Sequence, residues 1–183
     1  MELVKNFKYS ELAKQIFLAL AGTIILAISA KIKIPFVPVP MTMQTFVVLS
    51  IGIVFGWKLG VATIALYLFE GIIGLPVFSG TPEKGIGFVY FTGPTMGYLL
   101  GFVVAVYLAG KFNYDKNILK NFIKILFSTS FIYILGLVWL GILIGWDKPL
   151  FKLGAQPFLL AELFKILLIT ITISKIKKLK KFI

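Results

Sequence analysis

Ionisable side chains are rare inside the long apolar segments of this 183-residue chain, and two of them stand close together. Glu162 and Lys165 are three residues apart, so a helix places both on one face. A charge at the centre of a membrane-spanning helix costs ~2.5–3.5 kcal/mol on insertion scales, so such residues usually have a function. Because a carboxylate accepts N–H donors and an ammonium binds anions, the pair has two interpretations. It receives a small polar ligand, or it is a salt bridge that only neutralises itself.

A second polar group stands in the stretch PVPMTMQTF, between two apolar segments. The amide of Gln44 offers two donors and an acceptor, with Thr42 and Thr45 beside it. Gln44 could contact a ligand, or Thr42 could cap a helix while Gln44 bonds a neighbouring loop. Glu70 ranks lower, because it lies beside Gly71 near the end of its segment, where it can reach the membrane interface.

Aromatic residues surround the same end of the chain's apolar segments. They stand in or near glycine-rich stretches and allow two interpretations. Such residues commonly form a belt at the membrane interface, but a cluster can also wall a cavity for an amphipathic ligand. The residues concerned are Tyr67, Phe78, Tyr90, Phe91 and Tyr98.

Several kinds of chemistry are excluded by what the chain lacks. It has no cysteine and no histidine, so thiolate or imidazole metal sites and the commonest general base are absent. It has no phosphate-binding G-x-x-x-x-G-K-[ST] loop and no H-E-x-x-H motif. We therefore expect no catalytic residues, no metal site and no resident cofactor. One enzymatic alternative stays open, a small membrane enzyme that uses Glu162 and Lys165 as acid and base.

The elements that must position these residues are transmembrane helices. The chain is 59% hydrophobic and 14% charged, with mean hydropathy +0.99, whereas soluble domains carry roughly 25% charged residues. Apolar runs of membrane-spanning length recur. We predict an all-α integral membrane protein, with residues 1–183 as one domain of six transmembrane helices. The spans are Leu12–Ala30, Met41–Phe55, Leu59–Leu75, Pro94–Ala109, Leu119–Leu143 and Phe158–Ser174.

Lysine placement predicts the orientation. With the N-terminus inside, the inner segments hold 13 lysines and the outer segments hold 5, which favours both termini in the cytoplasm. The net charge of +12 therefore indicates topology and contact with anionic lipid, not nucleic acid. The three outer loops are rich in proline, glycine and aromatics. We expect structured extracytoplasmic loops that form a binding face.

Small residues recur at helical spacing in two spans and could let helices approach closely. Gly93, Gly97, Gly101, Ala105 and Ala109 line the fourth span, where packing inside the bundle is expected. A looser stripe in the first span could pack internally or dock another membrane protein, and we predict the docking role. This stripe consists of Ala19, Thr23, Ala27 and Ala30.

Three stretches together resemble the BioY family, the biotin-specific S components of energy-coupling-factor (ECF) vitamin transporters. They are IPFVPVPMTMQTF, a middle block from GWKLGVATIALYLFEGIIGLPVF to GPTMGYLLGF, and the late AQPFLLAELFK. The pairing of G-L-P-V-F with G-P-T-x-G-Y-L-x-G-F is specific, and the resemblance covers most of the chain. Six spans with both termini inside are what this family implies.

The resemblance implies a biotin cavity near the outer side, covered by the loop after the first helix and the loop before the fourth. The family's late motif is similar to P-F-x-x-G-D-x-x-K, in which the acid and the lysine contact biotin. Here Glu162 stands for the aspartate, Ala161 for the glycine and Lys165 for the lysine. The longer acid shifts the pocket by about one methylene. Some members add an arginine for the ligand carboxylate, and this chain has none, so Lys165 or Lys84 would serve.

Biotin has a ureido head with two N–H donors, an apolar ring and an anionic tail. We therefore expect Glu162 to accept the ureido N–H groups and Lys165 to bind the carboxylate. Tyr67, Phe78 and Tyr98 are the expected walls, with Gln44 and Tyr90 completing the site.

The resemblance further implies high-affinity biotin uptake across the cytoplasmic membrane, with no enzymatic activity in this chain. The implied partners are a transmembrane coupling subunit and two ATPase subunits, because the chain itself has no nucleotide site. An S component for a different vitamin is the alternative within this class.

Overall fold

Long helices dominate the computed structural model, which describes residues 2–80 and 87–179, with side chains from Ser10 onward. Two short strands and short helices form the connections. In chain order the elements are α1 (Glu2–Lys31), β1 (Lys33–Ile34), β2 (Met41–Thr42), α2 (Gln44–Ile72), η2 (Gly87–Thr92), α3 (Met96–Lys111), α4 (Ile118–Ile144), α5 (Leu150–Gly154), η3 (Gln156–Phe158) and α6 (Leu159–Leu179).

Four of the described helical segments are long and apolar enough to cross a membrane. They contain all of α2 and α4, most of α1, and α5 to α6 as one stretch. Helix α3 has 16 residues and is apolar but shorter. The prediction of a mostly helical membrane protein is therefore confirmed.

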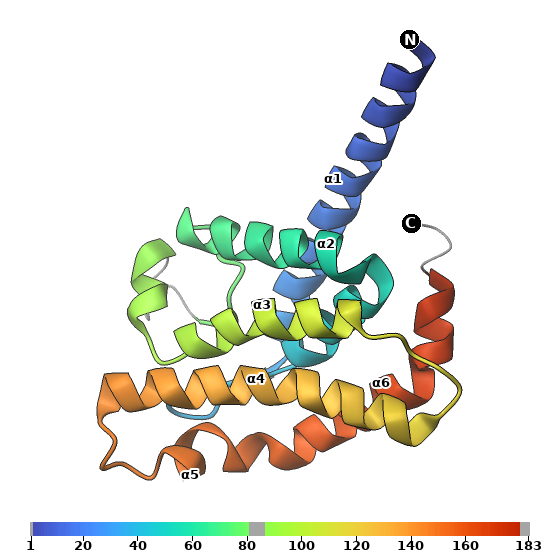
Figure 1. Ribbon diagram of the computed structural model, residues 1–183. Helices are drawn as coiled ribbons and strands as arrows, with labels where there is room; N and C mark the ends of the chain where they lie inside the picture. Colours follow the sequence, from blue (N-terminus) through green and yellow to red (C-terminus); the bar gives the residue numbers. More distant parts are fainter. Residues whose placement is uncertain (1, 81–86, 180–183) are drawn as a thin grey trace.

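Helix α2 bends sharply at Gly56 and holds both the second and the third predicted spans. The φ of Gly56 is 74°, in the left-handed region that glycine adopts without a Cβ clash. Its two arms fold back on one another (Figure 1). A Cβ added at Gly60 would lie 3.0 Å from Cγ2 of Val106, so the glycine in the second arm lets α3 (Met96–Lys111) pack closely against it. The second and third predicted spans are thus joined by a kink within one helix.

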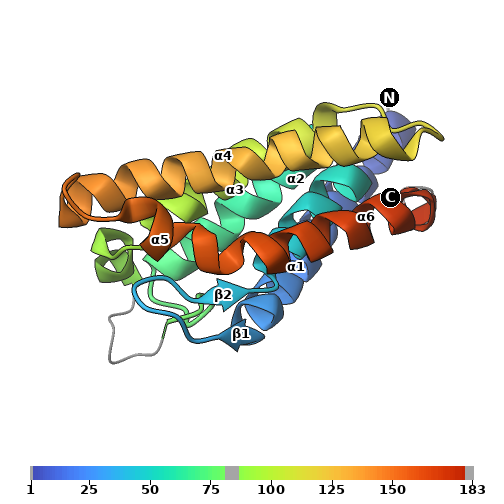
Figure 2. The ribbon, with the colours of Figure 1, turned by 90° about the horizontal axis from the view of Figure 1, so that it is seen from below.

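The bundle is layered, with α3 between α2 and α4, and α6 against α4 and α2 (Figures 1 and 2). The small residues of α3 make this possible. A Cβ on Gly101 would lie 2.5 Å from the Cα of Ile132, and one on Gly52 would lie 3.0 Å from the Cβ of Ala109. The glycine and alanine stripe of the fourth span therefore packs internally, as predicted.

Helix α1 runs obliquely to the other helices, and its first turns project from the bundle (Figure 1). Its small-residue stripe faces inward: Ala19, Thr23 and Ala30 are buried, and Ala27 is half-buried against the core. The Thr23 hydroxyl donates to Oε1 of Glu70 at 2.9 Å, which joins α1 to α2 inside the apolar region. The docking role predicted for this stripe is wrong, because the side chains are covered by α2. The outward face of α1 carries large apolar residues instead, including Phe17, Ile24 and Ile28.

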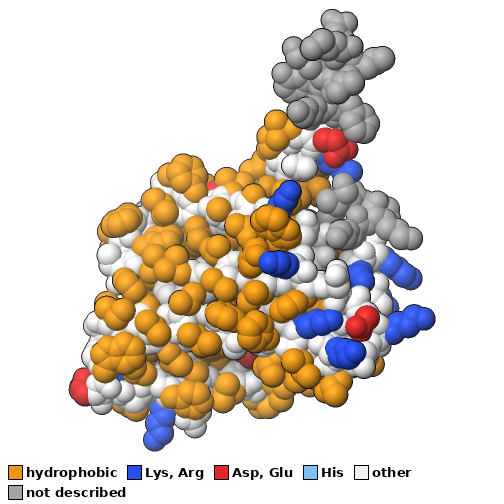
Figure 3. Space-filling model, viewed as in Figure 1, with side chains coloured by type: hydrophobic (Ala, Val, Ile, Leu, Met, Phe, Trp, Pro, Cys, Tyr) orange, Lys and Arg blue, Asp and Glu red, His pale blue; other side chains and the backbone are white. Residues whose placement is uncertain are grey.

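The two ends of the bundle differ in character. One, the loop-rich end, carries the β1–β2 hairpin, the described residues 73–80 and 87–95, and the connection 145–158. The hairpin is antiparallel and pairs Lys33 with Thr42 (Figure 2). The other, the lysine-rich end, carries the α3–α4 connection and the end of α6. Figure 3 shows lysines gathered there beside a largely apolar surface, with Lys111, Lys116, Lys120 and Lys177 in this part of the chain.

Candidate functional site

A small cavity of about 50 Å³ lies at the loop-rich end, among residues from the hairpin, α2, α3, α4 and α6. Its polar lining includes Glu162, Gln44 and Thr45, and its apolar lining includes Phe102 and Ile132. Elements far apart in the sequence therefore meet around one cavity, which we call the head cavity.

Glu162 and Lys165 form a buried pair beside this cavity. The Lys165 ammonium donates to Oε1 of Glu162 and to the backbone carbonyl of Thr42, both at 2.6 Å. The Thr45 hydroxyl donates to the same Oε1 at 3.2 Å. Among the described residues, Oε2 of Glu162 is the one buried side-chain polar atom without a hydrogen-bond partner. Native proteins rarely leave such an atom unpaired, because the loss costs ~1–3 kcal/mol.

The local sequence explains why Glu162 stands at this position. Pro157 lies at the start of the short helix η3, and α6 begins directly after it at Leu159. Glu162 therefore lies in the first turn of α6, where the helix dipole favours a negative charge. The helix start and the lysine one turn later together hold a buried carboxylate that faces the cavity.

Gln44 opens α2 and is held in a chain of hydrogen bonds. Its Nε2 donates to the hydroxyl of Tyr67 at 2.8 Å, and that hydroxyl donates to the carbonyl of Val77 at 2.9 Å. The Thr42 hydroxyl donates to Oε1 of Gln44 at 3.2 Å and accepts from its backbone N–H at 3.3 Å. Tyr67 takes one of two amide N–H donors. The amide is therefore fixed in orientation and still has a donor for the cavity.

Aromatic side chains from several elements line the head cavity. Phe78 stacks on Tyr90 with ring centroids 4.8 Å apart, and the Tyr90 hydroxyl pairs with Oγ of Ser79 at 3.1 Å. Tyr98 donates to the carbonyl of Gly154 at 2.8 Å, which joins α3 to α5. These hydrogen bonds fix the orientation of the Tyr90 and Tyr98 rings.

The structure brings together most of the predicted site residues. Five line the head cavity: Glu162, Gln44, Phe78, Tyr90 and Tyr98. Tyr67 and Lys165 lie one layer behind it, where they bond Gln44 and Glu162. Because neither residue lines the head cavity, their predicted contacts with a ligand stay predictions. Lys84 lies outside the described residues.

Three lining aromatics were missed by sequence reasoning, and one of them is Phe102 of α3. Tyr133 of α4 and Phe158 of η3 lie with ring centroids 6.3 Å apart and both line the head cavity. Phe158 carried a usable signal, because it stands four residues before Glu162 and would share its helix face. Tyr133 carried none, since it is one aromatic in a continuous apolar span.

The donor set suits an organic ligand better than a metal ion. In the described residues no group of three or more histidine, cysteine, aspartate or glutamate side chains gathers. An unpaired carboxylate oxygen, a fixed amide and aromatic walls instead fit an apolar ring that carries N–H donors. The cavity of about 50 Å³ is far smaller than the ~300–1,000 Å³ of ordinary ligand pockets. Ligand entry therefore requires wall side chains or loops to move.

Comparison with known proteins agrees with this kind of site. The family model of the BioY family matches residues 3–182. The chain belongs to the BioY family. A relative from Pyrococcus horikoshii, named a probable biotin transporter BioY, is 33% identical over 84% of this chain and 90% of its own length. The biotin transporter BioY of Thermotoga maritima is 31% identical over 91% of this chain and 98% of its own.

A solved structure shares the fold of this BioY family member. It is the crystal structure of an S-component for biotin from an ECF-type ABC transporter, and the two superpose with a TM-score of 0.75. The match covers 94% of this chain and 93% of the other, at 24% sequence identity. The arrangement of helices is therefore common to both proteins.

Proposed function

We propose that this protein binds biotin with high affinity and takes it up across the cytoplasmic membrane, as the substrate-specific component of an ECF-type transporter. The observation that carries the proposal is Oε2 of Glu162, a buried carboxylate oxygen without a partner that faces an aromatic cavity. Membership of the BioY family and relatives named biotin transporters support the same ligand.

The chemistry of biotin matches the cavity part by part. A ureido N–H would donate to Oε2 of Glu162, and the ureido carbonyl would accept the remaining N–H of Gln44. The apolar ring would lie among Phe78, Tyr98 and Phe158. Lys165 then acts through Glu162, whose buried charge it offsets, and does not contact the ligand.

The proposal includes a membrane topology for the chain. Six crossings would be made by α1, the two arms of α2, α3, α4 and α6, with both termini in the cytoplasm. The lysine-rich end would then face the cytoplasm and the loop-rich end the outside, in agreement with the positive-inside rule. Biotin would enter the head cavity from the outer side.

Energy for uptake would come from partner subunits, a transmembrane coupling subunit and two ATPases. The solved relative is a component of an ECF-type ABC transporter, and this chain has no phosphate-binding loop of its own. The outward face of α1, with Phe17, Ile24 and Ile28, is an apolar surface available to the coupling subunit within the membrane.

Direct binding to the purified protein tests the proposal. Calorimetry with biotin should give tight binding, whereas thiamine and riboflavin should give none. Glu162→Gln should weaken biotin binding by at least about tenfold, because a hydrogen bond to a charged group is lost. Glu162→Asp keeps the charge and should bind biotin more tightly than Glu162→Gln. If the unaltered protein does not bind biotin, or binds another vitamin more tightly, the proposed biotin specificity is refuted.

A further inference from the structure

A second cavity of about 130 Å³ adjoins the head cavity at the loop-rich end. The two share four lining residues, Pro40, Ser79, Tyr90 and Thr95. The second cavity continues outward along residues 35–38 and Gly80 and is bordered by Lys33. The two cavities are therefore neighbours, and a ligand held at Glu162 that extends past these shared residues would reach the cavity bordered by Lys33.

The charges along this path are unevenly distributed. Glu162 stands at the inner end, and Lys33 is the one cationic residue that lines either cavity in the described part of the chain. Lys165 lines neither, and two of its three donors are taken by Glu162 and the carbonyl of Thr42. An anionic group placed beside Glu162 would be repelled, whereas one placed at the outer cavity would meet an ammonium.

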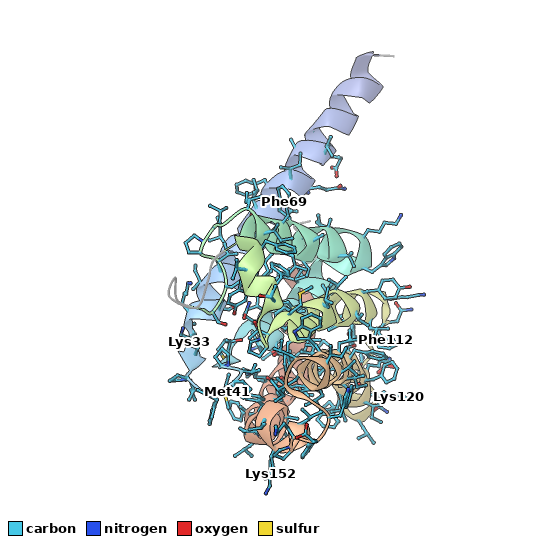
Figure 4. The ribbon with its side chains drawn as sticks, turned by 90° about the vertical axis from the view of Figure 1, so that its left-hand side faces the viewer. Lys33, Met41, Phe69, Phe112, Lys120 and Lys152 are labelled. Atoms are coloured by element: carbon cyan, nitrogen blue, oxygen red, sulfur yellow. The ribbon has the colours of Figure 1, made fainter. Side chains whose placement is uncertain are left out.

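The Lys33 ammonium is held by one hydrogen bond and has further N–H donors for a ligand. It donates to the carbonyl of Ser79, a residue that both cavities share. An ammonium has three donors, so the bond to Ser79 leaves others for an anion. Figure 4 looks onto the loop-rich end and shows Lys33 on the same side of the bundle as Met41, whereas Lys152 lies at another edge.

We propose that Lys33 binds the terminal carboxylate of the ligand, and that the second cavity is the subsite for its tail. This rests on the proposed function, in which biotin is the ligand and its ureido head lies at Glu162. Lys33 is then a specificity-determining residue that selects a free acid over an uncharged derivative.

Lys31 provides a matched control, because it makes the same kind of bond without lining either cavity. Its ammonium donates to the carbonyl of Phe78 at 2.7 Å, one residue before the carbonyl that Lys33 holds. If Lys33 served only to tie this segment to the end of α1, removing either lysine would have the same kind of effect on every ligand.

The experiment measures the affinity of the purified full-length protein for biotin and for biotinamide, whose tail is uncharged. The unaltered protein should bind biotin more tightly than biotinamide. Lys33→Met should weaken biotin binding by about fivefold to tenfold, which is the loss expected when a partly exposed hydrogen bond between charged groups is removed. Binding of biotinamide should change by less than about twofold, because its amide has no charge to pair with the lysine. Lys33→Arg should keep the preference. Added salt should reduce the preference in the unaltered protein, because it screens an exposed pair.

Three results would overturn the proposal while leaving biotin binding intact. Equal affinity of the unaltered protein for both ligands would remove the need for a cation. Equal weakening of both ligands in Lys33→Met, matched by Lys31→Met, would make the lysine a structural tie. Loss of the preference in Lys84→Met but not in Lys33→Met would assign the carboxylate to Lys84. Failure of the unaltered protein to bind either ligand would instead refute the proposed function itself.

Discussion

At the scale of single residues, Glu162 uses its two carboxylate oxygens differently. Oε1 accepts from Lys165 and Thr45, whereas Oε2 is buried and without a partner. One oxygen is therefore committed to holding the site together and the other is left for a ligand donor. The unpaired oxygen favours the ligand-binding interpretation of the pair over a salt bridge that only neutralises itself.

Replacing Lys165 alone should lower the stability of the protein more than replacing both Lys165 and Glu162. Lys165→Met leaves a buried, uncompensated carboxylate, which should destabilise the fold by ~3–5 kcal/mol. The double variant Glu162→Gln, Lys165→Met has no buried charge and should recover most of this stability without recovering biotin binding. Thermal unfolding in detergent and biotin titration measure the two effects separately.

The control is the exposed pair at the loop-rich end. Lys148 and Asp147 lie 2.9 Å apart, with more than half of each side chain exposed. Lys148→Met should change stability little, because surface pairs contribute about 0–1 kcal/mol. A double variant as unstable as Lys165→Met would show that the pair does not act as one unit.

A second residue-scale prediction concerns the hydroxyl of Tyr67, which orients Gln44. Tyr67→Phe removes the acceptor for Gln44 and the donor to Val77, so it should cost ~1–3 kcal/mol of stability and weaken biotin binding severalfold. The measurements are thermal unfolding and biotin titration.

Tyr114→Phe is the matched comparison, because its buried hydroxyl donates to the carbonyl of Ala109 at 2.9 Å at the lysine-rich end. It should lose stability but keep its affinity for biotin. Equal affinity in both variants would mean that the orientation of Gln44 is unimportant for binding.

At the scale of elements, the sequence predicted the positions of the helices and of the polar site residues. It predicted less well which face of each helix packs against other helices. Glu162 and Gln44 could be found because polar groups in apolar segments are costly and therefore informative. The stripe of Ala19, Thr23 and Ala30 was assigned to the wrong side, because small residues suit internal packing and docking equally well. Nothing within α1 says that α2 covers this face. Similarly, no local signal distinguishes Tyr133 from aromatics that face lipid.

Close packing of α3 against α4 leads to a prediction for this helix pair. A Cβ on Gly101 would meet the backbone of Ile132, which cannot rotate away. Gly101→Ala should therefore destabilise the protein by ~1–3 kcal/mol, the usual cost of overpacking. Leu100→Ala, one position away on an exposed face, should cost less. Comparison of the two unfolding midpoints in the same detergent checks this, and an inverted order would contradict the packing.

At the scale of the whole molecule, the asymmetry between the two ends connects binding to orientation. The head cavity lies at the loop-rich end, and the lysines that predict the cytoplasmic side gather at the other. A cavity that faced the cytoplasm could not capture a nutrient from outside. The direction of uptake therefore depends on the topology, which can be measured without any partner subunit.

The chain has no cysteine, so single-cysteine variants report topology without background. Lys116→Cys lies in the exposed α3–α4 connection, and Lys152→Cys lies in α5 at the loop-rich end. In intact cells a membrane-impermeant maleimide should label Lys152→Cys and spare Lys116→Cys, and both should react after the membrane is opened. The lysine bias is 13 to 5, so one substitution should not reverse the orientation. Labelling of Lys116→Cys alone in intact cells would place the cavity on the cytoplasmic side. That result would contradict the proposed topology.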